Sequence, residues 1–179
     1  MTGSGSGDRT SVRSVVEATA EAFGLDKRRL PGRRGGLDWL VVAPGGVFVV
    51  DEHAPQEERS VVIRTRQDPD VADHEGWHLL VDGTDHPHLL TGVQTRAAAV
   101  REVLESSGIA SWGVVVPVVC FQGAALPLLR RCLTAGRTHV VGPRGLAELL
   151  RRTGTLDERE RTRIRDLFEG AFPAGLAVA

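Results

Sequence analysis

Three acidic residues and a histidine flank two apolar runs in the stretch LDWLVVAPGGVFVVDEH, residues 37–53. Asp38 precedes the first run, LVVA, and Asp51 and His53 follow the second, VFVV. Carboxylate oxygens are the ligands that Mg²⁺ prefers, and an imidazole exchanges protons near neutral pH. These residue types therefore suit the divalent-metal site of a hydrolase.

The spacing of these residues depends on the turn between the runs. A proline and two glycines separate the runs and predict a buried β-hairpin. Asp51 and His53 lie two apart on one strand and share a face in any register. A two-residue turn on the proline and first glycine sets Asp38 opposite Asp51, and a turn on the two glycines sets it opposite His53. A three-residue loop sets Asp38 against Glu52 instead, and the apolar pattern leaves the register open.

The rest of the chain predicts an α/β fold in which helices flank a mixed β-sheet. Thr10 or Ser11 caps a first helix that ends at Gly24, and a linker then leads into the hairpin. Further strands are predicted at 60–66, 77–81, 113–121 and 138–141, and further helices at 91–106, 126–133, 143–152 and 156–168.

The charge is nearly balanced, with a formal net charge of −1. Such a chain has no global attraction to nucleic acid or to an anionic membrane, so DNA binding needs a local basic face. The densest basic cluster lies just before Asp38 and consists of Lys27, the single lysine, with Arg28, Arg29, Arg33 and Arg34. We interpret it either as a solvated loop or as a loop that contacts phosphates.

The chain of 179 residues suits one domain with a small appendage. Residues 1–9 are predicted to be a disordered tail, 10–152 the domain, and 153–179 a C-terminal helix and tail that pack on it. Cys120 and Cys132 are predicted to be free thiols. No signal peptide and no membrane span are recognisable, so we expect a cytoplasmic protein without a membrane partner.

The hairpin resembles the core of the nuclease-related domain (NERD) family, in which an aspartate, an apolar strand, a Gly-rich turn and a second apolar strand lead to Asp/Glu-x-Lys. A Trp-bearing strand, a loop at Pro87, a helix with Gln94 and a strand ending VVCF follow in the family's order. The resemblance covers residues 10–122. It implies a restriction-endonuclease-like α-β-β-β-α-β core of the PD-(D/E)XK group and Mg²⁺-dependent cleavage of DNA.

By this resemblance Asp38 and Asp51 hold the Mg²⁺, position 53 carries the catalytic group, and Gln94 supports the site from its helix. The chain has His53 where the family has a lysine, whose ammonium orients the attacking water and offsets charge on the phosphate. Histidine is shorter and a poor ligand for Mg²⁺. The family's N-terminal Gly-Glu is also missing, with Glu17 and Glu21 as the candidate replacements.

The two departures predict weakened or lost catalysis. Two functions follow: a Mg²⁺-dependent nuclease acting on DNA, or a catalytically inactive nuclease-fold domain that binds nucleic acid or a protein partner. The letters H-E-x-x-H at positions 74–78 match zinc proteases, but that motif needs a helix, and a strand is predicted from residue 77. His78, His86 and His88 are interpreted as turn and loop histidines rather than a zinc site.

Overall fold

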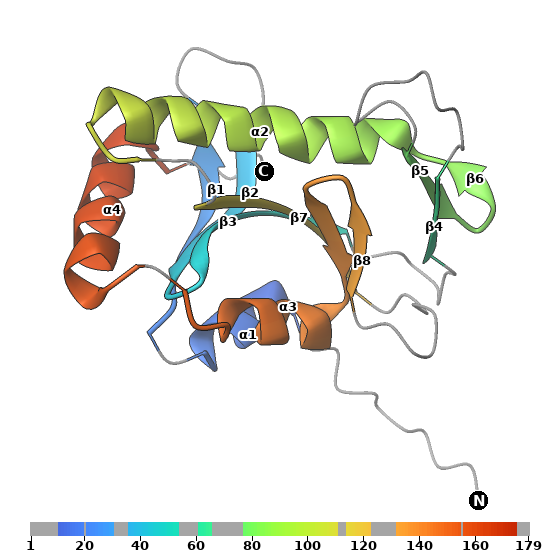
Figure 1. Cartoon of the computed structure of the whole chain (residues 1–179), viewed down its shortest axis with the longest axis horizontal. Helices are drawn as coiled ribbons and strands as arrows, with labels where there is room; N and C mark the ends of the chain where they lie inside the picture. The colour runs from blue at the N-terminus through green and yellow to red at the C-terminus, as the bar shows by residue number, and fades with distance from the viewer. Residues whose placement is uncertain are drawn as a thin grey trace, which may run out of the picture.

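The computed structural model describes residues 11–19, 21–30, 36–53, 61–65, 77–110, 114–122, 132–154 and 156–174. Within these ranges the chain forms a six-stranded sheet, a three-stranded sheet and four helices. Figure 1 shows the larger sheet between two layers of helix, with α2 on one face and α1 and α3 on the other.

The six-stranded sheet has the order β1-β2-β3-β7-β9-β8. Its strands are β1 (Phe23–Arg29), β2 (Gly36–Ala43), β3 (Gly46–His53), β7 (Val115–Phe121), β8 (Cys132–Ala135) and β9 (Thr138–Val141). The first three run antiparallel, β7 and β9 run parallel to β3, and β8 returns antiparallel to β9. The predicted mixed sheet flanked by helices is confirmed.

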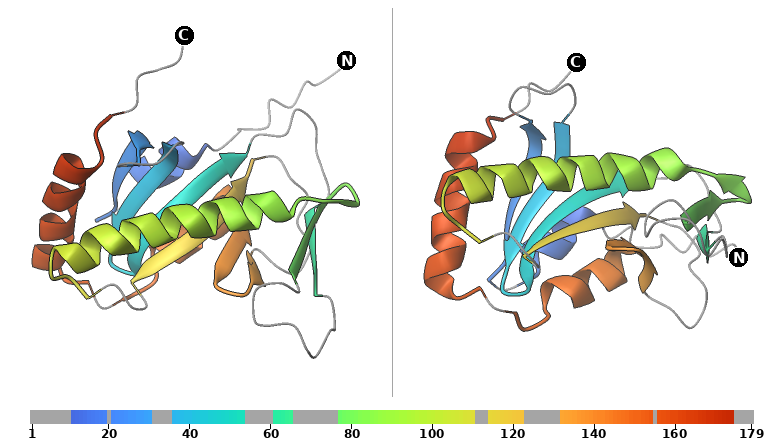
Figure 2. Two further views of the ribbon diagram at one scale, coloured as in Figure 1. Left: turned by 90° about the horizontal axis from the view of Figure 1, so that it is seen from above. Right: turned by 45° about the horizontal axis from the view of Figure 1, so that its top comes forward.

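Helix α2 (Pro87–Ser106) crosses one face of the sheet along most of its length (Figure 2). Its apolar residues recur at helical spacing and are buried against the sheet: Leu90, Val93, Ala97, Val100 and Leu104. On the other face, α1 (Val12–Glu17) and α3 (Pro143–Leu150) bury their own valines and leucines. Helix α4 (Glu158–Ala171) closes the end of the sheet near β1, with Ile164 and Phe168 in the core that α2 covers.

The smaller sheet follows β3 in sequence and consists of β4 (Val61–Thr65), β5 (Trp77–Val81) and β6 (Thr84–Asp85), all antiparallel. It lies beside the N-terminal end of α2 (Figure 2). The connection from β3 to β7 therefore contains this sheet and α2, and the long crossover allows β7 to run parallel to β3.

The hairpin of β2 and β3 has a two-residue turn made of Pro44 and Gly45, since Ala43 pairs with Gly46. Gly46 has a φ of 141°, and a Cβ there would lie 2.5 Å from the Val114 carbonyl oxygen, so the position requires glycine. Of the three turns considered for this hairpin, this is the one that sets Asp38 opposite Asp51. The two residues follow the pair Trp39–Val50 in the same ladder.

The predicted first helix is too long. The helix ends at Glu17, and residues 23–29, predicted as helix end and linker, form β1 instead. Basic residues obscure this strand in the sequence, whereas pairing with β2 and burial of Leu25 stabilise it. The helix predicted at 126–133 is wrong at its end, because Cys132 and Leu133 belong to β8; residues 126–131 lie outside the described ranges, as do the predicted tail at 1–9 and residues 175–179.

Candidate functional site

The alternation of β3 directs Asp51 and His53 toward α2. Val47 and Val49 lie in the core under α2, whereas Phe48 and Val50 lie in the core under α1 and α3. Asp51 continues the first row, and the Arg96 side chain of α2 meets it.

Asp51 forms a buried ion pair with Arg96. Arg96 Nη2 lies 3.1 Å from Asp51 Oδ2, and the Asp51 side chain is only 3% exposed. Arg96 Nε also donates a hydrogen bond to the Gly36 carbonyl oxygen at 3.0 Å, so the guanidinium joins the start of β2 to the end of β3. Asp51 Oδ1 is buried without a hydrogen-bond partner among the described residues.

Burial raises the pKa of Asp51 from 3.8 to about 6. The Arg96 charge acts in the opposite direction, and the Asp38 charge adds to the increase. Desolvation therefore outweighs the ion pair in setting how readily this carboxyl ionises.

Asp38 and His53 lie at the same end of the hairpin. Asp38 Oδ2 accepts a hydrogen bond from the Glu52 amide at 3.1 Å. The His53 ring packs on Phe121 with centroids 5.4 Å apart, and its Nε2 is buried without a partner in the described part of the chain. Burial lowers the pKa of His53; Asp38 opposes this shift, and the charges of Arg96 and two further histidines of α2's N-terminal end reinforce it.

Gln94 lies over a different part of the sheet. Its Nε2 donates a hydrogen bond to Thr138 Oγ1 at 3.1 Å, at the start of β9. The residue of α2 that reaches the acids is Arg96, which the sequence analysis missed. The sequence does contain a sign of this role. Arg96 follows Val93 by three residues and so lies at the border of the apolar face of the helix, where a charged side chain needs a partner.

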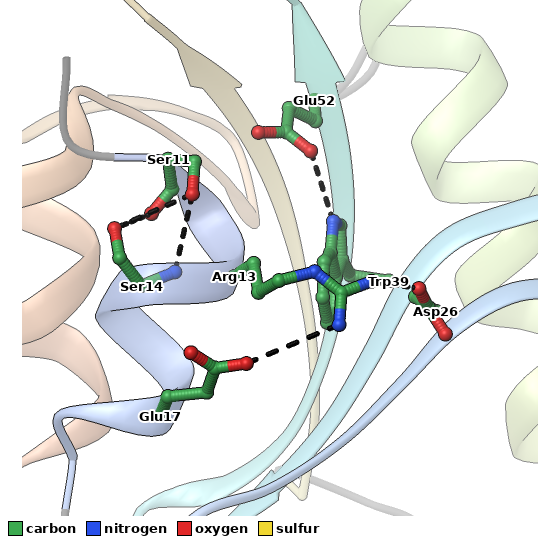
Figure 3. Close-up of polar contacts among 7 residues, drawn as sticks. All are labelled: Ser11, Arg13, Ser14, Glu17, Asp26, Trp39 and Glu52. Carbon is green, nitrogen blue, oxygen red and sulfur yellow. Dashed lines mark hydrogen bonds and ion pairs between the residues drawn. The ribbon is translucent and has the colours of Figure 1, made fainter.

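Glu52 points to the opposite face of the sheet and holds the end of β3 in place (Figure 3). Its carboxylate accepts hydrogen bonds from Trp39 Nε1 at 2.9 Å, from the Val12 amide at 3.2 Å and from Gln122 Nε2. The backbone amide of Gln122 donates a hydrogen bond to the His53 carbonyl oxygen at 2.8 Å. Strand β3 is thereby joined to α1, to β2 and to the residue that follows β7.

The acids of the N-terminal region are engaged away from Asp51. Glu17 pairs with Arg13 at 3.9 Å, and Arg13 lies over the Trp39 ring at 5.3 Å and also contacts Asp26 (Figure 3). Glu21 pairs with Arg161 of α4 at 3.2 Å. The two glutamates that the sequence suggests as replacements for the missing Gly-Glu therefore have ion-pair partners other than Asp51.

The predicted basic loop is in part a strand. Lys27 lies in β1 between the pairs Asp26–Trp39 and Arg28–Leu37, at the level of Asp38, and its side chain is exposed. Arg28 Nη1 donates to the Phe172 carbonyl oxygen at 3.5 Å. Arg33 and Arg34 lie outside the described residues.

The histidine motif has the strand context that the sequence predicted. His78 lies in β5 and contacts Asp85 of β6, while residues 74–76 lie outside the described ranges. His86 and His88 flank the first residue of α2, with ring centroids 5.5 Å apart. The interpretation as turn and loop histidines is therefore correct only for His86, since His78 lies in a strand and His88 in the first turn of a helix.

The donor set at the end of the hairpin does not fit a metal ion well. Among the described residues, no three His, Cys, Asp or Glu side chains converge in a way that would hold one. Each predicted ligand already has one oxygen engaged, Asp51 by a guanidinium and Asp38 by a backbone amide. The Mg²⁺ site stays a prediction from the sequence.

Comparisons with known proteins add nothing to this geometry, since no family model, curated protein or solved structure matches the chain. No helix in the described ranges has both the length and the apolar character needed to cross a bilayer.

Proposed function

We propose that this chain is a nuclease-fold domain that binds DNA at the open end of the β2–β3 hairpin without cutting it. Of the two functions that the sequence predicts, Mg²⁺-dependent hydrolysis and non-catalytic binding, the geometry favours the second. The observation that carries the proposal is the buried ion pair of Arg96 with Asp51.

The order of elements supports a nuclease-related fold. Helix α1, the antiparallel strands β1 to β3, helix α2 and the parallel strand β7 follow the α-β-β-β-α-β order that the resemblance implies. The three strands β4 to β6 are an addition between β3 and α2.

The ion pair disfavours hydrolysis. A carboxylate that holds Mg²⁺ must be ionised and must turn its oxygens toward the cation. Asp51 is buried, and one of its oxygens faces a guanidinium, which offers only hydrogen-bond donors, so Mg²⁺ would have to displace Arg96 to bind there. His53 lacks an ammonium, and burial favours its neutral form.

The charges around the hairpin end support DNA binding. The Arg96 guanidinium neutralises Asp51, so this acid no longer repels a phosphate. Lys27 and Arg29 are exposed on β1, the strand beside Asp38. Two cations at an exposed strand match a sequence-independent contact with two backbone phosphates.

Fluorescence anisotropy with labelled duplex DNA tests the proposal. Removing two phosphate contacts in Lys27→Gln/Arg29→Gln should weaken binding and lessen the slope of log K against log salt by about 2, since each contact contributes roughly 0.9. The control is Arg151→Gln/Arg159→Gln, which removes two exposed arginines, one at the end of α3 and one in the first turn of α4.

Equal salt slopes for the two double variants would refute the proposed binding surface. A second assay separates binding from hydrolysis: the same DNA, incubated with the wild type and Mg²⁺ or Mn²⁺, should stay intact. If the wild type cleaves the DNA and Asp51→Asn does not, the chain is a nuclease and the proposed non-catalytic function is wrong.

A further inference from the structure

The β8–β9 hairpin carries a cysteine and a histidine in contact. Cys132 Sγ lies 3.3 Å from His139 Nδ1, within hydrogen-bonding distance for sulfur. The two residues are diagonal neighbours on one face, because Cys132 pairs with Val141 and Thr134 with His139. Both side chains are partly buried. The contact lies on the α3 side of the sheet, away from Asp51 and His53 on the α2 side.

We propose that Cys132 and His139 form a nucleophile and general-base pair, a thiol site that reacts with small uncharged carbon electrophiles. This inference is independent of the DNA-binding proposal. The arrangement is the one that activates a weak nucleophile, with the base within hydrogen-bond reach of the group that it deprotonates. The thiol donates to Nδ1 when the imidazole carries its own proton on Nε2.

The groups around the pair favour proton transfer during the reaction over a preformed thiolate. Burial raises the pKa of Cys132, while the Arg152 charge and a hydrogen bond from Thr134 lower it and Glu148 raises it. Burial and Arg152 together lower the pKa of His139. Both partners are therefore neutral at rest. Arg152 stabilises the sulfur anion that forms as the proton leaves, whereas burial and the same Arg152 oppose the positive charge on His139, so the proton moves only during the reaction.

The reacting step is simple with iodoacetamide as the probe. The sulfur attacks the carbon that bears iodine, the carbon–iodine bond breaks, and iodide leaves as the sulfur–carbon bond forms. The thiol proton passes to His139 Nδ1. The sulfur is alkylated, and no external reductant or oxidant takes part.

Cys120 provides an internal control. It is buried on β7, and burial raises the pKa of its thiol to about 12. Cys120 of β7 and Cys132 of β8 both pair with Val141, from opposite sides of β9. Their backbones are therefore two strand spacings apart, ~10 Å. This separation exceeds the span of a disulfide, and both thiols are free.

The experiment measures iodoacetamide alkylation of each cysteine by mass spectrometry over a range of pH. In the wild type, Cys132 should react while Cys120 does not. The rate of Cys132 alkylation should become independent of pH between the pKa of His139 and the pKa of Cys132. In His139→Gln the rate should fall by about a hundredfold, the lower end of the range for loss of a general base. His78→Gln, which changes a half-buried histidine of β5 that pairs with Asp85 and not with Cys132, should leave the Cys132 rate unaltered.

Two results would overturn the proposal. One is a wild-type Cys132 rate that rises tenfold with each pH unit throughout, because a simple thiolate reaction needs no base. The other is an equal rate in His139→Gln, with the fold of that variant verified by circular dichroism. The pH profile needs only the wild type, so the proposal stays testable even if the variant does not fold.

Discussion

Asp51 and Arg96 are unequally buried, since the Asp51 side chain is 3% exposed and that of Arg96 is 29% exposed. A carboxylate in such a position costs free energy to ionise, and the guanidinium offsets part of this cost. Removing one partner of a buried pair destabilises proteins by about 3–5 kcal/mol, because the other charge is left uncompensated. Arg96 therefore stabilises the fold as well as balancing the charge of Asp51.

The raised pKa of Asp51 predicts how stability depends on pH. Between about pH 4 and about pH 6 the native state binds the Asp51 proton more tightly than the unfolded chain does. The free energy of unfolding should therefore fall as pH rises through this window, by about 3 kcal/mol at 1.36 kcal/mol per pKa unit.

Urea denaturation of the wild type and Asp51→Asn at a series of pH values measures this contribution. From low to neutral pH, the unfolding free energy of the wild type should fall relative to that of Asp51→Asn. His53, whose lowered pKa has the opposite effect on stability below about pH 6.5, is present in both proteins and largely cancels. If the difference in unfolding free energy stays constant across the pH range, burial does not raise the pKa of Asp51, and the prediction is wrong.

At the scale of elements, the open end of β3 is held from both faces of the sheet. Arg96 of α2 holds Asp51 on one face, and Glu52 binds Trp39, Gln122 and the α1 backbone on the other. The backbone amide of Glu52 also fixes Asp38. The geometry of the candidate site therefore depends on contacts from helices on both sides.

Glu52→Ala should destabilise the domain by about 3 kcal/mol or more, because three part-buried donors lose their acceptor and each unsatisfied donor costs roughly 1–3 kcal/mol. The amides of α1 should also exchange faster with deuterium in this variant. Glu17→Ala is the matched control; its side chain is 67% exposed, so we expect a change within about 0.5 kcal/mol. Similar losses in the two variants would show that Glu52 has no special part in holding α1.

The sequence predicted those elements that have a strong local signal. Two apolar runs around Pro44 and Gly45 were sufficient for the hairpin, and the apolar spacing of 91–106 was sufficient for most of α2. Strand β1 was missed because its pairing with β2 is a tertiary effect that outweighs its basic composition. Which partner Arg96 takes depends on how α2 lies across the sheet, and no local pattern specifies that.

At the scale of the whole molecule, the parallel pairing of β3 with β7 beneath α2 places the end of the hairpin next to the N-terminal half of that helix. The same crossover brings the three small strands to this end of the molecule (Figure 2). With a net charge of −1, DNA binding should be weak and confined to the β1 side, where the exposed cations lie. The candidate site is thus formed by β2, β3 and α2 together.

In the proposed function, Arg96 supplies to Asp51 the positive charge that a nuclease would obtain from its metal. The most direct test follows the ¹³C resonance of the Asp51 side-chain carboxyl during a Mg²⁺ titration at neutral pH, with Asp51→Asn to assign it. The resonance should not move in the wild type and should shift in a folded Arg96→Met variant, where the carboxylate has lost its partner. A saturable shift in the wild type would contradict the claim, because Mg²⁺ would then bind Asp51 despite the arginine.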